Sequence, residues 1–214
     1  MDQTEYVQYG CGWSAPNGWR NFDASPTLRF ERIPLIGTLY TKNDARFPAN
    51  VEYGDVVRGL PISPGSCRGV YSSHVLEHLA LDDFRIALRN TYEILRPSGT
   101  FRLVVPDLEY SARTYIESRS KTAASEFIRD TNLGHESRAR GIKGLARTWL
   151  GNSQHLWMWD YKSMQTELEN AGFVEVRRAT FGDSSDPMFR TVENEDRWKN
   201  CLGVECCKPS GGLG

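Results

Sequence analysis

The sequence lacks the features of a membrane protein, a secreted protein or a dedicated nucleic-acid binder. None of its apolar runs approaches the ~20 residues that a membrane-spanning helix needs. The first residues, Met1–Glu5, have neither the basic nor the apolar region of a secretory signal. Lys and Arg total 26 against 27 Asp and Glu, so there is no basic excess to attract a polyanion. We therefore expect a cytoplasmic protein that binds neither nucleic acid nor membrane.

Cysteines are few and show no disulfide framework. Five occur, an odd number, and only Cys206 and Cys207 are adjacent. This pattern is typical of reduced thiols in a cytosolic protein. Internal repeats are absent as well, and the only low-complexity stretch is the tail, residues 209–214, for which we predict disorder.

The 214 residues suffice for one domain with a substantial core, and 39% of them are hydrophobic. Segments with strand-like and helix-like periodicity alternate along the chain. Strands are expected at residues 5–9, 19–22, 68–72, 100–105, 173–181 and 202–206. This alternation predicts an α/β domain, residues 1–208, with a largely parallel sheet.

Two helices are well marked and a third is expected. The apolar residues of 82–95 recur at helical spacing, with Asp82 as a possible N-cap. A second helix over 163–171 has Ser163 as a plausible N-cap and Gly172 just past its end. A third is expected from His74 to about residue 81.

Residues 108–161 interrupt the alternation and are rich in Arg, Ser and Thr. We interpret them as a helical insertion that covers a pocket. Four cations lie within it without an intervening acid: Arg138, Arg140, Lys143 and Arg147. Such a run usually marks a solvated face, and the alternative is a surface that attracts an acceptor carrying phosphate or carboxylate.

The first predicted strand runs into a Gly-x-Gly turn at Gly10 and Gly12, where a ligand can approach the main chain closely. Asp23 ends the next predicted strand, where a carboxylate can accept hydrogen bonds from a ribose diol. Only ten residues separate Gly12 from Asp23, too few for a crossover helix. Without a helix N-terminus to offset a pyrophosphate, the loop disfavours NAD and FAD more than a nucleoside without phosphate. An ordinary tight turn is the alternative.

Six segments in chain order resemble the motifs of one branch of the class I S-adenosylmethionine (SAM) dependent methyltransferases. They are Gly10-Cys11-Gly12 with Gly18–Asp23, Gly54–Val56 with Leu60-Pro61, Tyr71–Leu79, Leu95–Thr100, Val105–Asp107, and Gly172-Phe173 with Glu205–Pro209. None of these motifs is specific alone, but together they cover nearly the whole chain in register.

The resemblance implies a Rossmann-like seven-stranded sheet, mostly parallel, with an antiparallel last strand and SAM across the carboxyl ends of the strands. By that resemblance Gly10 and Gly12 would face the methionine and ribose, and Asp23 would hold the ribose hydroxyls. Asp55 would meet the adenine amino group. The remaining implied contacts, near the sulfonium, are Ser72 and His74.

Two features depart from the family pattern. Gln8 and Tyr9 stand where the family has an acidic residue before the first glycine, and the glycine run stops at two. These departures favour, as an alternative, a protein of the same fold that binds a ligand or partner without turnover.

The segment His74–His78 also matches the H-x-x-E-H signature of zinc peptidases. His74 and His78 can share one helical face, and Glu77 could activate a metal-bound water. A catalytic zinc needs a third protein ligand, which the sequence leaves open. Because Glu77 has a simpler role as an acid in a first helical turn, we assign no metal and keep a zinc hydrolase as a further alternative.

Candidate catalytic groups follow from position. His155 begins a segment dense in aromatics and is either packed on the sheet or a general base for an acceptor hydroxyl. Asp107, just past a predicted strand, is either a second base or a helix N-cap. His74 is the third candidate, and His135 also lies in the insertion. We expect methyl transfer from SAM to a small-molecule or glycan-precursor acceptor.

Overall fold

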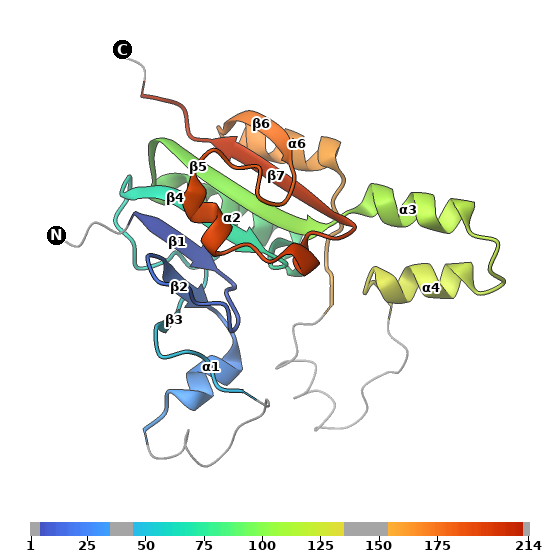
Figure 1. The fold of residues 1–214 in the computed structure, drawn as a ribbon, viewed down its shortest axis with the longest axis horizontal. Coiled ribbons are helices and arrows are strands. Elements are labelled where there is room, and N and C mark those ends of the chain that lie inside the picture. Colours follow the sequence, from blue (N-terminus) through green and yellow to red (C-terminus); the bar gives the residue numbers. More distant parts are fainter. Residues whose placement is uncertain (1–4, 35–44, 135–153, 212–214) are drawn as a thin grey trace.

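The computed structural model describes residues 5–34, 45–134 and 154–211. A seven-stranded sheet with the order β3-β2-β1-β4-β5-β7-β6 forms its centre (Figure 1). The strands are β1 (Tyr6–Tyr9), β2 (Arg20–Asp23), β3 (Val51–Tyr53), β4 (Cys67–Ser73), β5 (Leu95–Pro106), β6 (Val174–Ala179) and β7 (Cys201–Cys207). β1 to β5 pair in parallel, and β7 is antiparallel to both of its neighbours. The expected α/β class, with its antiparallel last strand, is confirmed.

All six predicted strands are present, and β3 is the strand that the sequence pattern did not predict. β5 begins at Leu95 rather than at residue 100, because Leu95 already pairs with Cys67. A register shift on β4 between Cys67 and Gly69 accommodates the stretch that contains Pro97 and Gly99.

The connection from β1 to β2 contains turns and no helix, as the short spacing predicts. The two strands nevertheless pair in parallel, with Val7 opposite Arg20. The buried side chains of Gln8 and Asn21 fix this connection. Gln8 Nε2 donates to the Ser14 carbonyl (2.6 Å) and to Asn21 Oδ1 (2.5 Å). Gln8, at the place where the family has an acid, therefore holds the loop.

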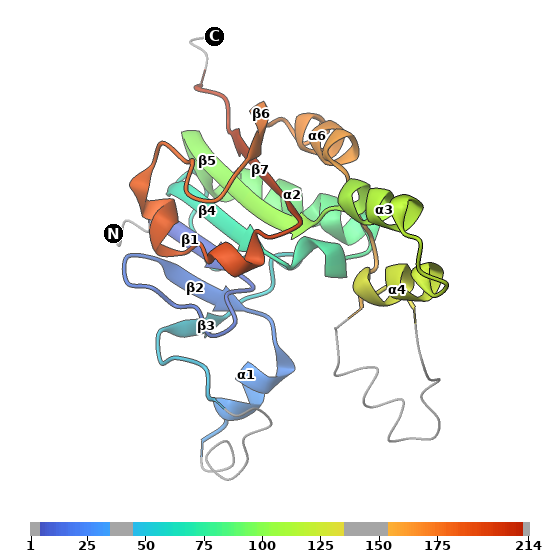
Figure 2. The ribbon, with the colours of Figure 1, turned by 45° about the vertical axis from the view of Figure 1, so that its right-hand side comes forward.

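The described part of the chain contains five α-helices and three 3₁₀ turns. The helices described are α1 (Pro26–Glu31), α2 (Leu81–Ile94), α3 (Leu108–Glu117), α4 (Ala123–Asp130) and α6 (Tyr161–Asn170). The 3₁₀ turns are η1 (Leu76–His78), η2 (Pro187–Thr191) and η3 (Glu195–Arg197). α3 and α4 lie side by side beyond the end of β5 (Figures 1 and 2), so the first part of the expected insertion, residues 108–130, is mainly helical.

Three expectations about helix ends were wrong. α2 starts one residue early, after Ala80, so Asp82 lies in its first turn instead of capping it. Asp160 caps α6 and forms a capping box with Ser163, which had been expected to be the cap itself. The helix expected from His74 is only the single turn η1, because His74 has a positive φ of 55° that an α-helix does not allow.

The sheet has a different cover on each face. On one face α2 and α6 bury the larger core cluster, which includes Phe84, Leu88, Met164 and Leu168. On the other face the η2–η3 segment covers the sheet in front of β1 and β4 (Figure 1), with Phe189 at the centre of a second cluster. The carboxyl ends of β1 to β4 form one edge of the sheet, which carries most of the predicted cofactor residues.

Some expectations fall outside the described residues: the cationic run at 138–147, His135 and the last three residues of the tail. No helix in the described ranges is long and apolar enough to cross a membrane. The five cysteines all lie within those ranges, and none forms a disulfide there.

Candidate functional site

The carboxyl ends of β1, β2, β3 and β4 bring most of the predicted cofactor residues to one edge of the sheet. β1 and β4 are neighbours, with Tyr9 opposite Ser72, and the Gly10–Gly12 turn follows directly on β1. Asp23 is the last residue of β2, and Asp55 lies two residues beyond β3. Ligands of open α/β sheets bind in the crevice at such an edge, where the strand order reverses.

The glycine turn and Asp23 are joined by a hydrogen bond. The Gly12 amide donates to Asp23 Oδ2 at 2.9 Å, and the Ser25 amide donates to Asp23 Oδ1 at 2.8 Å. Both glycines of the turn have positive φ, 65° at Gly10 and 54° at Gly12. Because a carboxylate has about four lone-pair sites, Asp23 keeps acceptor capacity for a further donor.

The two glycines face different surroundings. A Cβ at Gly12 would meet nothing within 4 Å, whereas a Cβ at Gly10 would lie 2.0 Å from Val75 Cγ2. Gly10 is therefore required for the close packing of the β1 and β4 loops, and Gly12 borders open space.

The other predicted cofactor residues differ in how they are engaged. Ser72 is buried, 1% exposed, and its hydroxyl has no hydrogen-bond partner in the described part of the chain. Asp55 accepts the Val57 amide at 2.9 Å and pairs with Arg58 at 3.5 Å, so it shapes the turn after β3. An unpaired buried hydroxyl at this edge is a group that a ligand could satisfy.

His74 is held on both ring nitrogens. Its Nε2 lies 2.9 Å from the Arg197 carbonyl, and its Nδ1 lies 3.3 Å from Glu77 Oε1. Burial lowers the pKa of His74, but contacts with Cys201, Glu77 and the Arg197 carbonyl outweigh it and raise the pKa to about 10. A histidine with that pKa is protonated at neutral pH and does not accept a proton there.

Arg197 is the contributor that sequence reasoning missed. Its guanidinium donates to the Ser73 hydroxyl (3.0 Å) and carbonyl (2.7 Å), while its own carbonyl contacts His74. Arg197 of η3, which lies near the C-terminus, thus fixes Ser73 at the end of β4. No local signal marks Arg197, because its partners are more than a hundred residues away in the sequence.

Asp107 has the geometry of a helix N-cap. Its Oδ1 accepts the amides of Glu109 (2.8 Å) and Tyr110 (3.3 Å) at the start of α3. Its Oδ2 lies 3.5 Å from Arg178. Of the two roles left open for Asp107, the capping role is thus accounted for, and a role as a base stays a prediction.

His155 lies against η1 rather than against the β5 exit. Its Nε2 is 4.0 Å from Glu77 Oε1, and its ring packs edge-on to that of His78 with centroids 5.0 Å apart. Burial, the largest influence, lowers the pKa of His155, so the neutral imidazole is favoured. The structure thereby joins His74, Glu77, His78 and His155 in one group.

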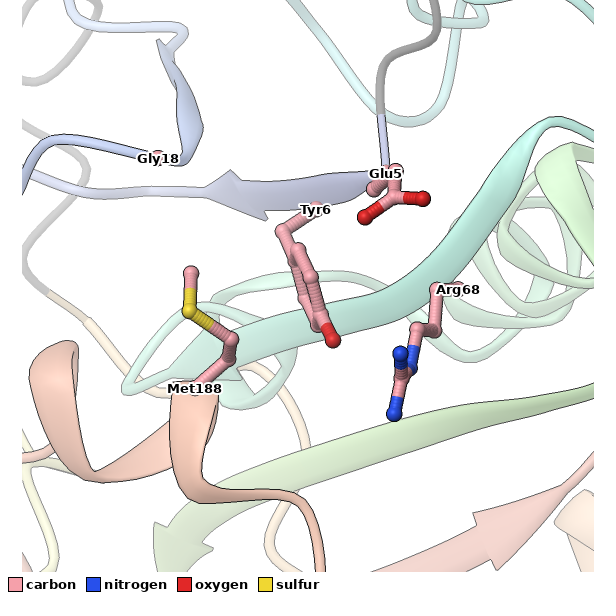
Figure 3. A pocket seen from close by; sticks show the side chains of 5 residues that line it. All are labelled: Glu5, Tyr6, Gly18, Arg68 and Met188. Atoms are coloured by element: carbon pink, nitrogen blue, oxygen red, sulfur yellow. The ribbon is translucent and has the colours of Figure 1, made fainter.

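A pocket is present at the opposite end of β1 and β4 (Figure 3). It is lined by Glu5, Tyr6, Gly18, Arg68 and Met188. The Tyr6 hydroxyl donates to Asp186 Oδ2 at 2.7 Å, and Arg68 Nε lies 3.1 Å from the same oxygen. The Tyr6 hydroxyl and the Arg68 guanidinium therefore both bind Asp186, at the end of the strands opposite to the carboxyl edge.

Comparisons with known proteins concern the family and the fold. The sequence profile of a family described as a methyltransferase domain matches residues 37–103. Among curated proteins, none matches the sequence.

One solved structure with a TM-score of 0.50 shares the fold, and two further structures are similar to the chain. A SAM-dependent methyltransferase from Archaeoglobus fulgidus is 14% identical, with a TM-score of 0.50, and the alignment covers 95% of this chain and 86% of that one. A chain from the Haloferax volcanii complex between the Trm112 methyltransferase activator and a methyltransferase is 17% identical, covering 98% and 84%, with a TM-score of 0.49. Phosphoethanolamine N-methyltransferase 2 of Haemonchus contortus, solved with SAM, is 12% identical, covering 96% and 49%, with a TM-score of 0.49.

Proposed function

We propose that this chain, a methyltransferase domain with the class I SAM-dependent fold, transfers a methyl group from SAM to a small-molecule or glycan-precursor acceptor. One observation carries the proposal. The Gly10–Gly12 turn, tied to Asp23 by the Gly12 amide, borders open space at the same sheet edge as Ser72. A main chain free of Cβ atoms beside an acceptor carboxylate suits a ribose.

Each cofactor residue then has a defined role. Asp23 accepts from the ribose hydroxyls with the lone pairs that the Gly12 and Ser25 amides leave free. Asp55 is positioned after β3 for the adenine amino group, and the Ser72 hydroxyl lies unpaired near the place of the sulfonium. Gly10 keeps the β1 loop against Val75, which fixes the width of the crevice.

SAM, when bound, supplies a methyl group on a sulfonium whose sulfur is a good leaving group. The chain's own task is then to hold the acceptor in line with that methyl, since positioning alone can supply a large part of the barrier reduction. A strong base is optional for this chemistry. Roles for Asp107 and His155 as bases and a catalytic role for His74 stay predictions, because the contacts found for all three are with the protein itself.

We further propose that residues 108–161 border the acceptor space within a single domain, residues 1–208. The position of α3 and α4 beyond the end of β5 supports this (Figure 2). The Asp107 cap and the Arg178 pair fix the start of α3 at the carboxyl edge. An insertion anchored there can shape an acceptor site without contributing a catalytic group.

Calorimetric titration with SAM and with its demethylated product tests the cofactor. We expect both to bind, and Asp23→Asn to weaken SAM binding about 10-fold or more, because one oxygen acceptor is lost at the ribose. The matched control is Asp83→Asn, an exposed acid in the first turn of α2, for which affinity should not change. Thermal melting of both variants shows whether the β1 loop still folds.

Three outcomes are decisive. No binding at millimolar SAM contradicts the cofactor assignment, and equal affinity of Asp23→Asn and wild type contradicts the role of Asp23. Binding of SAM without product formation, across small-molecule and glycan-precursor acceptors, would favour the alternative of a ligand-binding protein without turnover.

A further inference from the structure

Glu77, His78 and His155 meet at the end of β4, although His155 is distant in the sequence. One ligand-type atom of each lies within 4.8 Å of the other two. His78 Nε2 and His155 Nε2 are each 4.0 Å from Glu77 Oε1. Two imidazoles and one carboxylate therefore point at a common centre.

The carboxylate of Glu77 is buried beside the ring of His74. The residue is 0% exposed, and neither of its carboxylate oxygens has a hydrogen-bond partner in the described ranges. The facing groups are the two imidazoles and His74, whose Nδ1 forms an ion pair at 3.3 Å. An ionised carboxylate in such a place costs several kcal/mol unless a cation satisfies its remaining lone pairs.

Backbone contacts fix His78 in the form that binds metals. Its Nδ1 lies 2.8 Å from the Gln154 carbonyl. Because a carbonyl only accepts hydrogen bonds, Nδ1 must carry the proton, and the lone pair of Nε2 is left facing Glu77. Metal-binding histidines are typically oriented by a hydrogen bond of this kind from the other ring nitrogen.

The segment that carries His155 is tied to the same turn. The amides of Leu156 and Trp157 both donate to the Glu77 carbonyl, at 2.8 and 3.1 Å. The His155 amide donates to the Asn132 carbonyl at 3.4 Å. The segment that follows His155 is thus held by the main-chain carbonyl of Glu77. Such hydrogen bonds provide the rigidity that a metal site requires.

We propose that Glu77, His78 and His155 bind a divalent transition-metal ion. Bonds from Zn²⁺ to His nitrogen and carboxylate oxygen are about 2.0–2.2 Å, so the ligand atoms of a tetrahedral ion lie about 3.4 Å apart. The two His nitrogens, each 4.0 Å from Glu77 Oε1, therefore move closer to that oxygen by about half an ångström when the ion binds. Imidazole ligands suit zinc, iron, nickel and copper, whereas magnesium and calcium prefer oxygen. Three protein ligands leave a position for water or for an oxygen of a bound molecule.

This site changes the interpretation of two residues. Glu77 is an acid in the first turn of η1, as the sequence predicts, and it is also buried within a histidine cluster. His155, predicted as a base, holds the ion. The site is independent of the proposed methyl transfer, because its ligands and its test involve no SAM.

Metal binding to the full chain tests the site. The protein is stripped with a chelator, dialysed against Zn²⁺ or Mg²⁺, and analysed for bound metal, with thermal melting alongside. We expect one zinc per chain, a zinc-dependent rise in Tm, and much weaker binding of magnesium. His155→Gln, His78→Gln and Glu77→Gln should each weaken zinc binding by about 100-fold or more, since even the partners that orient ligands are worth 10- to 100-fold.

Glu117→Gln, which changes an exposed glutamate at the end of α3, is the matched control and should bind zinc as wild type does. The folded wild-type protein decides the matter even where a variant fails to fold. Absence of stoichiometric zinc, magnesium binding as tight as zinc binding, or unchanged zinc affinity in folded His155→Gln would each overturn the proposal. Calorimetry with SAM is a separate measurement, so failure of one proposal is distinguishable from failure of the other.

Discussion

The two faces of the sheet are stabilised in different ways. Behind β1 to β5, the helices α2 and α6 present apolar stripes to the sheet, and Phe84 stacks on Trp159 with ring centroids 4.2 Å apart. On the other face, the η2–η3 segment has little regular structure and covers the sheet with aromatic rings and with Glu193, which pairs with a buried arginine of β5, Arg102.

Arg102 organises the face that lacks α-helices. Its guanidinium is fully buried and pairs with Glu193, with Asp183 at 2.9 Å and with Glu205 at 2.9 Å. It also donates to the Thr180 carbonyl at 2.7 Å and lies 4.6 Å from the ring of Trp198. Five residues of the C-terminal part of the chain thus converge on one side chain of β5.

The comparison shows that a sheet face without α-helices can be covered by a segment held by directional ion pairs and hydrogen bonds. Helix burial is tolerant, because any apolar residue of similar volume continues to fill the stripe. An ion-pair network is not, because removal of one member leaves the others buried and unpaired. Three pairs of substitutions test this contrast.

The largest effect is expected for Arg102→Met, which keeps the bulk of the side chain but removes the charge. It leaves the buried carboxylate of Glu193 without its cation, whereas Glu205 and Asp183 keep their pairs with Arg177, so we expect a loss of about 3–5 kcal/mol in the free energy of unfolding. Chemical denaturation measures this loss. The control is Arg113→Met, which breaks an exposed pair with Glu109 and should cost at most about 0.5 kcal/mol. Similar losses in the two variants would contradict the contrast.

A smaller and equal effect is expected for apolar truncations on the two faces. Leu168→Ala on α6 and Phe189→Ala on η2 both remove a side chain that is 0% exposed. Each should cost about 3 kcal/mol, because a cavity forms in either place. Denaturant midpoints compare them under one set of conditions. A Phe189→Ala loss well below that of Leu168→Ala would show that the second face is loosely packed.

The smallest effects come from the caps. Asp160 caps α6 by a local capping box, and Asp160→Ala should cost about 1 kcal/mol. Asp186 caps η2 through the Met188 amide but also binds the Tyr6 hydroxyl and Arg68. We therefore expect Asp186→Ala to cost about 2 kcal/mol, more than a cap alone. Equal losses from thermal melting would indicate that the bonds to β1 and β4 contribute nothing.

Much of the fold could be predicted because its signals are local. Alternation marked six of the seven strands, and the short spacing between Gly12 and Asp23 excluded a helix there. β3 has only three residues, of which only Val51 is buried, so periodicity has almost nothing to detect. The sequence pattern predicts a helix that begins at His74, but His74 has a positive φ that a helix does not allow. This conformation depends on hydrogen bonds to Arg197 and Val104, which no local pattern contains.

The sequence by itself determined the α/β class, the order of its elements and the residues at the ends of the strands, because turn chemistry and apolar periodicity act between near neighbours. Only the tertiary structure decided which of those residues meet. It brought His155 to Glu77 and Arg197 to Ser73, and it covered one sheet face with an arginine network instead of helices. Such contacts join residues far apart in the chain, and they form only when burial makes each unpaired charge costly.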